Sequence, residues 1–373
     1  MTAIAFLNCH IDYMADDFDI TVVCNFDGQE TRISQNANLE NIRIIRPISP
    51  FADAKSIWNL TRFLKKNKFV IVHSVSPKAG LITAVSGWLA RTPIRIHWFT
   101  GQVWVLTQGP KRLLLMNLDR LIALLATSVL VDSPSQREFL LDQRVIKASK
   151  SSVLGAGSIS GVDTKRFRPN LESRNAVRKE LGIEDPKAPI ILFVGRLSKD
   201  KGLDTLLAVF ASGELTNKPF LLLVGPDEDS YKSRLSRILG AQMERSRYIE
   251  FTQEPERYMA AADIFCMPSL REGFGLSIIE AASVGLPAVA SQIYGITDAV
   301  EDQLTGILTT PGSYLELLEA LNRLLLNSTE RAIMGAMARK RVGDVWLARN
   351  LQGLLRSYYE LQIESSTVKG DVS

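Results

Sequence analysis

Two charged loops in the second half of the chain hold residue types that can bind a diphosphate. The first reads GRLSKDKG over residues 195–202 and follows the apolar run 189–194. Arg196 and Lys201 can clamp two phosphate groups, and the glycines at the two ends let the backbone approach a ligand closely. An ordinary solvated basic loop has the same composition, so this loop alone leaves both interpretations open.

The second loop leads into a helix. It reads PSLREGFG over residues 268–275 and is followed by LSIIEAA, residues 276–282. The helix amino terminus favours an anion, because its unpaired amides and the helix dipole point there. Glu272 lies in the loop and Glu280 in the helix, so we expect them to face different parts of one ligand, with Glu280 accepting two ribose hydroxyls. The weaker alternative is a glycine-flanked helix with ordinary surface acids.

Together the two loops resemble glycosyltransferase family 4, whose members retain the anomeric configuration and have the GT-B fold. The resemblance rests on Gly195-Arg196-Leu197, Lys201-Gly202 and the spacing Glu272-x7-Glu280, and it spans nearly all of the second half. It implies that Arg196 and Lys201 hold the donor diphosphate, Glu280 the ribose and Glu272 the sugar hydroxyls. The further donor-binding candidates are Gly195, Gly273, Phe274, Gly275, Leu276 and Ser277.

Two stretches of the first half, VHSVSPKAG over 72–80 and RIHWFTGQVW over 95–104, resemble a bacterial subgroup of this family. That subgroup extends lipid-linked oligosaccharides for surface polysaccharide or protein glycosylation. Lys78 is a candidate for an acceptor phosphate, and Trp98 or Trp104 for stacking on a sugar. His97 fits an acceptor site or a hydrogen-bonded structural role equally, since the family's Thr-x-His-Gly segment aligns Thr100 with its histidine. The acceptor-side candidates are Lys78, His97, Thr100 and Gln102.

The reaction that the resemblance implies is transfer of a hexose or N-acetylhexosamine from a nucleotide-diphosphate sugar, with UDP as carrier, to a hydroxyl of a lipid-linked glycan. No residue stands out as a covalent nucleophile, so the leaving diphosphate would guide the attack. We expect no metal or other cofactor, because the cations and the helix amino terminus can stabilise the diphosphate. The acidic run 227–229 fits a solvated loop. The alternatives are a nucleotide-sugar epimerase of the same architecture and an inactive, truncated sugar-nucleotide-binding homologue.

Short apolar runs alternate with helical patterns in both halves, which predicts parallel sheets with crossover helices. The expected strands are 19–24, 41–46, 69–73, 94–98, 128–131 and 152–154, and then 189–194, 220–224, 248–251, 263–267, 288–290 and 306–308. We therefore expect two doubly wound, Rossmann-like domains facing a cleft, joined by the Gly- and Ser-rich segment 155–170. The domains are an acceptor-side domain over 1–163 and a donor domain over 164–345. A helix over 346–373 would pack back on the first domain and end in a frayed tail.

The composition favours a cytoplasmic enzyme. The 44 basic and 40 acidic residues give a net charge of +4, which does not suggest nucleic acid as a partner. The three cysteines lack the spacing of a zinc site, and no export signal or spanning segment is evident. The apolar run 113–125 lies beside Lys111, Arg112 and Arg120. It fits either a core helix or a helix on the anionic inner face of the cytoplasmic membrane.

The beginning of the chain departs from the family pattern. Residues 3–14 already read as a helix and lead into the strand 19–24, so the first strand of the N-terminal domain is missing from the pattern. That strand is central in a doubly wound sheet, and its loss would leave backbone groups unpaired. We expect either that Met1 is not the native start or that the chain is a truncated form, active or inactive.

Overall fold

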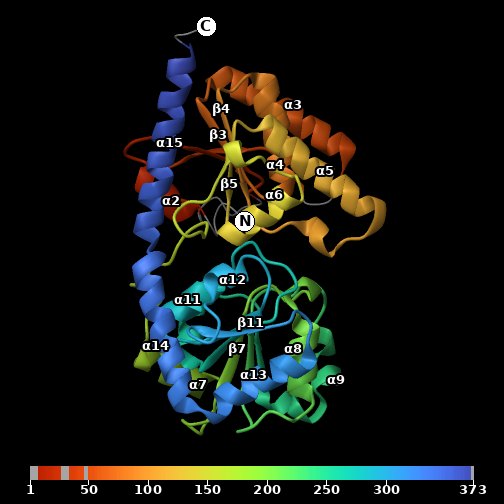
Figure 1. Cartoon of the computed structure of the whole chain (residues 1–373), viewed down its shortest axis with the longest axis vertical. Coiled ribbons are helices and arrows are strands. Elements are labelled where there is room, and N and C mark those ends of the chain that lie inside the picture. The colour runs from red at the N-terminus through yellow and green to blue at the C-terminus, as the bar shows by residue number, and fades with distance from the viewer. Residues whose placement is uncertain (1–6, 27–32, 46–48, 371–373) are drawn as a thin grey trace. The chain divides into compact units, whose positions relative to one another are not determined.

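The computed structural model describes residues 7–26, 33–45 and 49–370 (Figure 1). The chain divides into unit 1, Met1–Gly161 with Ala348–Ser373, and unit 2, Val162–Leu347. The division falls inside the Gly- and Ser-rich segment, close to the boundary at Asp163 that the sequence suggests. An isolated parallel bridge between Val162 and Leu347 lies where the chain enters and leaves unit 2.

Unit 2 contains one parallel sheet of six strands in the order β12-β11-β10-β7-β8-β9. The strands are β7 (Ile190–Val194), β8 (Phe220–Val224), β9 (Ser246–Ile249), β10 (Ile264–Met267), β11 (Ala288–Ser291) and β12 (Gly306–Thr309). The central strands are almost entirely apolar because helices cover both faces of the sheet, as parallel sheets require. This arrangement confirms the predicted doubly wound fold for the second half.

Two helical layers bury the two faces of this sheet. Ile190 and Leu192 of β7 pack with α7 (Leu171–Glu180), α10 (Pro255–Ala261), α11 (Leu276–Val284) and α14 (Ser328–Val345). Ile191 and Phe193 point to the other face and pack with α8 (Leu203–Ala211), α9 (Leu235–Leu239) and α13 (Tyr314–Leu326). The short helix α12 (Ile296–Ala299) follows β11. Alternate side chains of one strand therefore build two separate cores.

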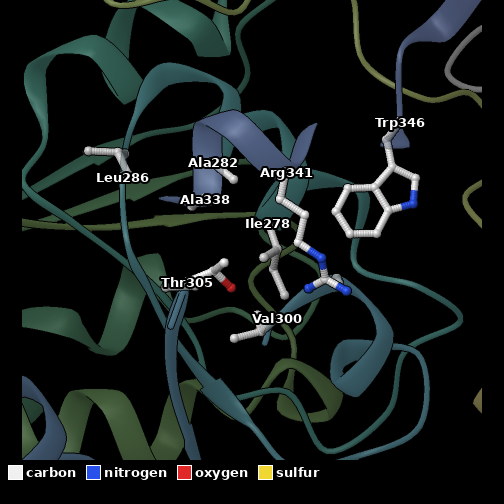
Figure 2. Close-up of a pocket in the computed structure, with 10 residues that line it drawn as sticks. Ile278, Ala282, Leu286, Val300, Thr305, Ala338, Arg341 and Trp346 are labelled. Carbon is white, nitrogen blue, oxygen red and sulfur yellow. The ribbon is translucent and has the colours of Figure 1, made fainter. Parts of the chain in front are cut away.

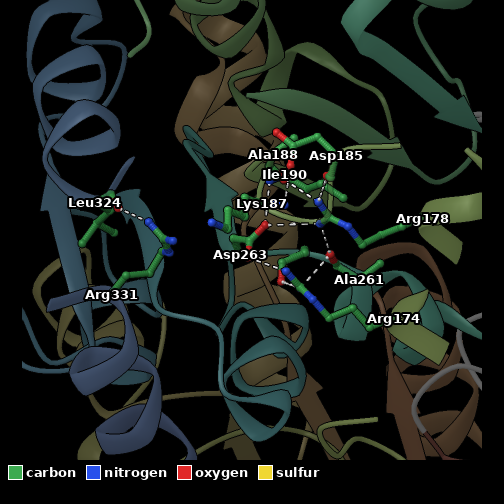
Figure 3. A network of polar contacts seen from close by, with 11 residues as sticks. Arg174, Arg178, Asp185, Lys187, Ala188, Ile190, Ala261, Asp263, Leu324 and Arg331 are labelled. Carbon is green, nitrogen blue, oxygen red and sulfur yellow. Dashed lines mark hydrogen bonds and ion pairs between the residues drawn. The ribbon is translucent and has the colours of Figure 1, made fainter. Parts of the chain in front are cut away.

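A polar network closes the amino ends of β7 and β10 (Figure 3). Asp263 pairs with Arg174 at 2.8 Å, and its second carboxylate oxygen accepts the Ile190 amide at 2.8 Å. Arg178 donates to the Ala188 carbonyl at 2.6 Å. Ligands of parallel sheets bind at the opposite, carboxyl edge, so we assign these contacts a structural role.

The described strands of unit 1 form two parallel sheets rather than one. β1 (Thr21–Cys24) pairs with β2 (Asn38–Asn41), and β3 (Ile71–Val75), β4 (Ile94–Phe99), β5 (Ser128–Val131) and β6 (Ser151–Ser152) form the second sheet. The strand expected at 41–46 lies earlier in the chain, as β2. The pairing ends where β1 ends, at Cys24, whose carbonyl accepts the Ile42 amide hydrogen. The helix expected at 3–14 is present as α2 (Asn8–Met14), and residues 1–6 lie outside the described part.

Helices α3 (Pro50–Asn67), α4 (Pro77–Ala90) and α5 (Gly109–Leu125) lie side by side in unit 1 (Figure 1). The other helices of unit 1 are α6 (Pro134–Asp142) and α15 (Ala348–Gly370), and α15 packs with α2 and β4. The helix α15 packs on unit 1 as expected, because Tyr358, Tyr359 and Ile363 contact the core around Trp98. No described helix is long and apolar enough to cross a bilayer.

Candidate functional site at the carboxyl edge of the second sheet

Three loops meet at the carboxyl ends of β10, β7 and β8, which are neighbours at the centre of the sheet. We call them the β7 loop (195–202), the β8 loop (225–231) and the β10 loop (268–275). A Cβ atom on Gly202 would lie 1.8 Å from the Pro268 carbonyl oxygen, and one on Gly225 would lie 2.0 Å from the Gly195 oxygen. Both glycines also have positive φ values, so no other residue fits without moving a loop.

The β7 loop brings both predicted diphosphate cations to this edge, and each is paired with a carboxylate from another loop. Lys201 forms an ion pair with Glu272 of the β10 loop, with side chains only 14% and 12% exposed. Glu272 also accepts a hydrogen bond from Ser269 Oγ at 3.1 Å. Arg196 pairs with Glu228 of the β8 loop. The structure therefore unites Arg196, Lys201 and Glu272 in one cluster.

Asp200 joins the β7 and β10 loops. Its carboxylate lies 2.6 Å from Arg271 and 3.4 Å from Arg196, and it accepts a hydrogen bond from Ser198 Oγ. Its backbone carbonyl accepts the Leu270 amide at 2.9 Å. Burial acts to raise the pKa of Asp200, but the Ser198 hydrogen bond and the two guanidinium groups together lower it below its usual value. Asp200 is thus an ionised centre that orients two arginines.

Glu280 lies on α11, which begins after Gly275 and ends before Gly285, as the sequence predicts. Within the described residues, the Glu280 carboxylate has no hydrogen-bond or ion-pair partner, although the side chain is partly buried. Burial raises the pKa of Glu280 to about 8, with a smaller lowering by the charge of Arg166. A partly buried carboxyl group without a partner gains from a ligand that supplies hydrogen-bond donors, such as hydroxyl groups.

The remaining donor-binding candidates surround the start of α11. Ser277 Oγ donates to the Val194 carbonyl at 3.2 Å, which ties the first turn of α11 to the end of β7. Leu276 is half-buried, and Gly273 and Gly275 are buried in the loop. The ring of Phe274 packs edge-on against Trp346 in the core, so Phe274 anchors the loop from beneath.

The acidic residues of the β8 loop all have protein partners. Asp227 accepts the amides of Tyr231 and Lys232, both at 2.8 Å, and Asp229 accepts the Lys199 amide at 2.8 Å. Across the described residues, no three or more His, Cys, Asp or Glu side chains are grouped as metal ligands. The pairing of Glu228 with Arg196 was not predicted, because nothing in the run 227–229 indicates which other loop it contacts.

The acceptor-side candidates Lys78 and His97 lie at two places in unit 1. Lys78, at the start of α4, forms an ion pair of 2.7 Å with Asp53 of α3. His97 is 2% exposed and its Nδ1 lies 2.9 Å from Ser74 Oγ. Its ring packs so closely beneath Gly80 that a Cβ there would lie 2.3 Å from the imidazole. Burial lowers the pKa of His97 to about 3, so the ring is neutral.

Thr100 and Gln102 follow β4 and share one partner on α6. Gln136 Nε2 donates to the Thr100 carbonyl at 2.5 Å and to Gln102 Oε1 at 3.1 Å, and Gln102 is buried. The indoles of Trp98 and Trp104 are fully buried, and Trp104 donates to Asp119 at 2.7 Å. Neither indole presents a face to a sugar in this structure.

Comparison with known proteins connects this geometry to a family. Residues 173–341 match the model of the Glycosyl transferases group 1, and residues 12–157 match the Glycosyl transferase 4-like domain. The chain belongs to glycosyltransferase family 4. This glycosyltransferase is 27% identical over 357 residues to the Staphylococcus aureus capsular polysaccharide biosynthesis glycosyltransferase CapM, covering 95% of this chain and 92% of CapM. It is 26% identical to the Escherichia coli UDP-Gal:alpha-D-GlcNAc-diphosphoundecaprenol alpha-1,3-galactosyltransferase, covering 83% and 80% of the two chains.

Solved structures with the same fold cover nearly the whole chain. Anabaena Alr3699/HepE, in complex with UDP and glucose, has a TM-score of 0.80 at 20% identity, covering 94% of this chain and 95% of HepE. WaaG, a glycosyltransferase involved in lipopolysaccharide biosynthesis, has a TM-score of 0.70 at 17% identity, covering 90% of each chain. The expected GT-B fold is confirmed. The enzyme is a glycosyltransferase that uses a nucleotide sugar, which favours transfer over the epimerase alternative.

Unit 2 of the glycosyltransferase also contains a small cavity, which residues outside the β7, β8 and β10 loops line (Figure 2). Ile278, Ala338, Arg341 and Trp346 are among its lining residues, and none of the lining residues belongs to the three loops. Its volume of about 10 Å³ gives room for about one water molecule. The cavity is therefore a packing gap between α11 and α14 and not a nucleotide site.

Proposed function

We propose that the enzyme transfers a hexose or N-acetylhexosamine from a UDP-sugar to a hydroxyl of a lipid-linked glycan, with retention of configuration, during surface polysaccharide synthesis. The observation that carries the proposal is the cluster of Arg196, Lys201 and Glu272 on loops that meet at the carboxyl edge of the sheet. The name of the Escherichia coli relative specifies a UDP-galactose donor and a diphosphoundecaprenol acceptor, and that of CapM a capsular polysaccharide.

Each residue has a distinct part in this proposal. Arg196 and Lys201 bind the diphosphate oxygens and stabilise the negative charge that develops as UDP departs. The diphosphate replaces the carboxylates of Glu228 and Glu272 as the partner of these cations. Glu272, freed from Lys201, accepts hydroxyl groups of the sugar, and Glu280 accepts the ribose hydroxyls. The acceptor hydroxyl attacks the anomeric carbon on the face that the diphosphate leaves. The new C–O bond replaces the bond to UDP, the hydroxyl proton passes to the departing diphosphate, and the configuration is retained.

Catalysis without a metal is part of the proposal. Two cations and the amino terminus of α11 supply the charge stabilisation that a divalent ion provides in other transferases. The three carboxylates of the β8 loop accept backbone amides or pair with Arg196, which leaves them poorly suited to hold a cation. Activity that survives excess EDTA supports this part of the proposal, and loss that Mg²⁺ restores contradicts it.

The proposal locates the enzyme in the cytoplasm, in peripheral contact with the inner face of the membrane that carries its acceptor. The exposed leucines 113, 114, 121 and 124 of α5, with the cations Lys111 and Arg112 at its start, suggest such a contact. A soluble enzyme that modifies a lipid-anchored glycan gains from this location because the acceptor is confined to the bilayer surface.

A panel of nucleotide sugars tests the proposed reaction. The donor that raises the melting temperature most by mass action is then incubated with a diphosphoundecaprenol-linked N-acetylhexosamine, and UDP release and the product anomer are measured. We expect UDP release that depends on the acceptor and an α-linked product from an α-linked donor. Conversion of the donor into its epimer without acceptor supports the epimerase alternative. Donor binding without UDP release supports an inactive homologue.

A further inference from the structure

The outer side of α3 presents large aromatic side chains to solvent. Phe51 is 92% exposed and Trp58 is 70% exposed, although the opposite side of the helix buries Ser56, Leu60 and Leu64. Exposing a phenyl ring and an indole to water forgoes the free energy that burial of such large apolar surfaces provides. An exposed apolar patch of this kind on a soluble protein marks an interaction surface.

Cations alternate with these aromatic residues. Phe51, Lys55, Trp58, Arg62 and Lys66 follow one another at spacings of three or four residues, which places them on one side of the helix. Lys55, Arg62 and Lys66 are exposed, and no described ion pair involves them. We call these five residues the α3 stripe.

Further exposed apolar residues lie on the other two helices of the layer that contains α3. Trp88 and Leu89 are exposed at the end of α4, and Leu114, Leu121 and Leu124 are exposed on α5. Figure 1 shows α3, α4 and α5 side by side, and α4 packs against both of the others. The exposed apolar residues therefore belong to one layer of three helices.

This layer is strongly basic, although the whole chain has a net charge of only +4. Helices α3, α4 and α5 contain eight Lys and Arg and two acidic residues, Asp53 and Asp119. Asp53 pairs with Lys78, and Asp119 is buried and accepts the Trp104 indole hydrogen. The exposed side of the layer is thus cationic, because both acidic residues already have partners within the protein.

We propose that the α3 stripe, with the exposed ends of α4 and α5, is a docking surface for an anionic lipid bilayer. Tryptophan favours the headgroup region of a bilayer, and each cation near an anionic surface contributes about 1 kcal/mol. A second copy of this face is a poor partner, because two surfaces with this excess of cations repel each other. This docking surface rests on the proposed function and assigns its peripheral membrane contact to the α3 stripe.

Vesicle flotation with the full chain tests this surface without donor or acceptor, so the result is independent of the transfer reaction. The vesicles are phosphatidylcholine with phosphatidylglycerol, compared with phosphatidylcholine alone. We expect binding to the anionic vesicles that weakens at high salt. The double variant Lys55→Gln/Arg62→Gln removes two cations from the α3 stripe and should bind about 30-fold more weakly. Phe51→Ser/Trp58→Ser should also lose binding.

The matched control is Arg339→Gln/Lys340→Gln, which removes two exposed cations from α14 in unit 2. It should bind as the wild type does, and far-ultraviolet circular dichroism should show all variants folded. Absence of wild-type binding to anionic vesicles overturns the proposal, and so does an equal loss in the control. A dimer by light scattering that Phe51→Ser/Trp58→Ser dissociates, without vesicle binding, would identify a protein interface and also overturn it.

Discussion

Lys201 and Glu272 form an ion pair that joins the β7 and β10 loops across 71 residues of sequence. Both side chains are largely shielded from water, so each charge depends on the other for compensation. In the proposed reaction the same two groups separate, because Lys201 turns to the diphosphate and Glu272 to the sugar. In the free enzyme these two ligand-binding charges therefore compensate each other as an ion pair.

A single and a double variant of this pair separate its structural and catalytic parts. Lys201→Met leaves Glu272 uncompensated and should lower the free energy of unfolding by about 2 to 3 kcal/mol. Lys201→Met/Glu272→Gln should recover most of that stability while transferring no more sugar than the single variant. Urea denaturation and UDP release measure the two effects. Full activity in the stable double variant would rule out a catalytic part for the pair.

Substitution of two carboxylates near Arg196 should change donor affinity in opposite directions. Asp200→Asn loosens both Arg196 and Arg271, so we expect the KM for the donor to rise about tenfold. Glu228→Gln removes a carboxylate that competes with the diphosphate for Arg196, so the donor should bind more tightly. Steady-state kinetics on both variants give the comparison. A parallel change in the two variants would contradict the assigned geometry.

The ionisation of Glu280 should make donor binding depend on pH. Its pKa is raised to about 8, so the free protein is most stable with Glu280 protonated, and that stability is lost as pH rises through about 8. Ribose hydroxyls donate to the ionised form, so donor affinity should increase toward pH 8 and level off above it. Titration calorimetry across this range provides the measurement. Glu280→Gln is the control, and an identical pH profile in that variant would exclude Glu280 as the cause.

His97 should affect folding more than donor binding. The pKa of this buried ring is lowered to about 3, so its contribution to stability is present above the ordinary histidine pKa and is lost as pH falls toward 3. His97→Gln should reduce the acid sensitivity of thermal unfolding and leave the donor Kd within about twofold, because a neutral buried side chain acts through packing. A large loss of transfer to the acceptor with unchanged stability would instead identify His97 as an acceptor-site residue.

The sequence predicted those parts of the fold that depend on local pattern. The strands 128–131 and 220–224 are as predicted because continuous apolar runs are sufficient to locate buried strands. The helix α11 was also predicted, because Gly275 and Gly285 mark its two ends in the sequence. The partners of Asp200 and Glu228 were not predictable, since both lie on loops that only the strand order brings together. The burial of His97 likewise depends on α4 packing over β4 through Gly80.

UDP-sugar affinity in three variants tests whether the β7 loop and α11 bind the donor. Arg196→Ala and Glu280→Ala should each weaken binding by about 1.5 to 3 kcal/mol, the cost of losing a charged hydrogen-bond partner. Lys199→Ala removes an exposed cation from the same loop and should stay within about twofold of wild type. Titration calorimetry on folded protein should give this order. Wild-type affinity in both Arg196→Ala and Glu280→Ala would show that the β7 loop and α11 do not bind the donor.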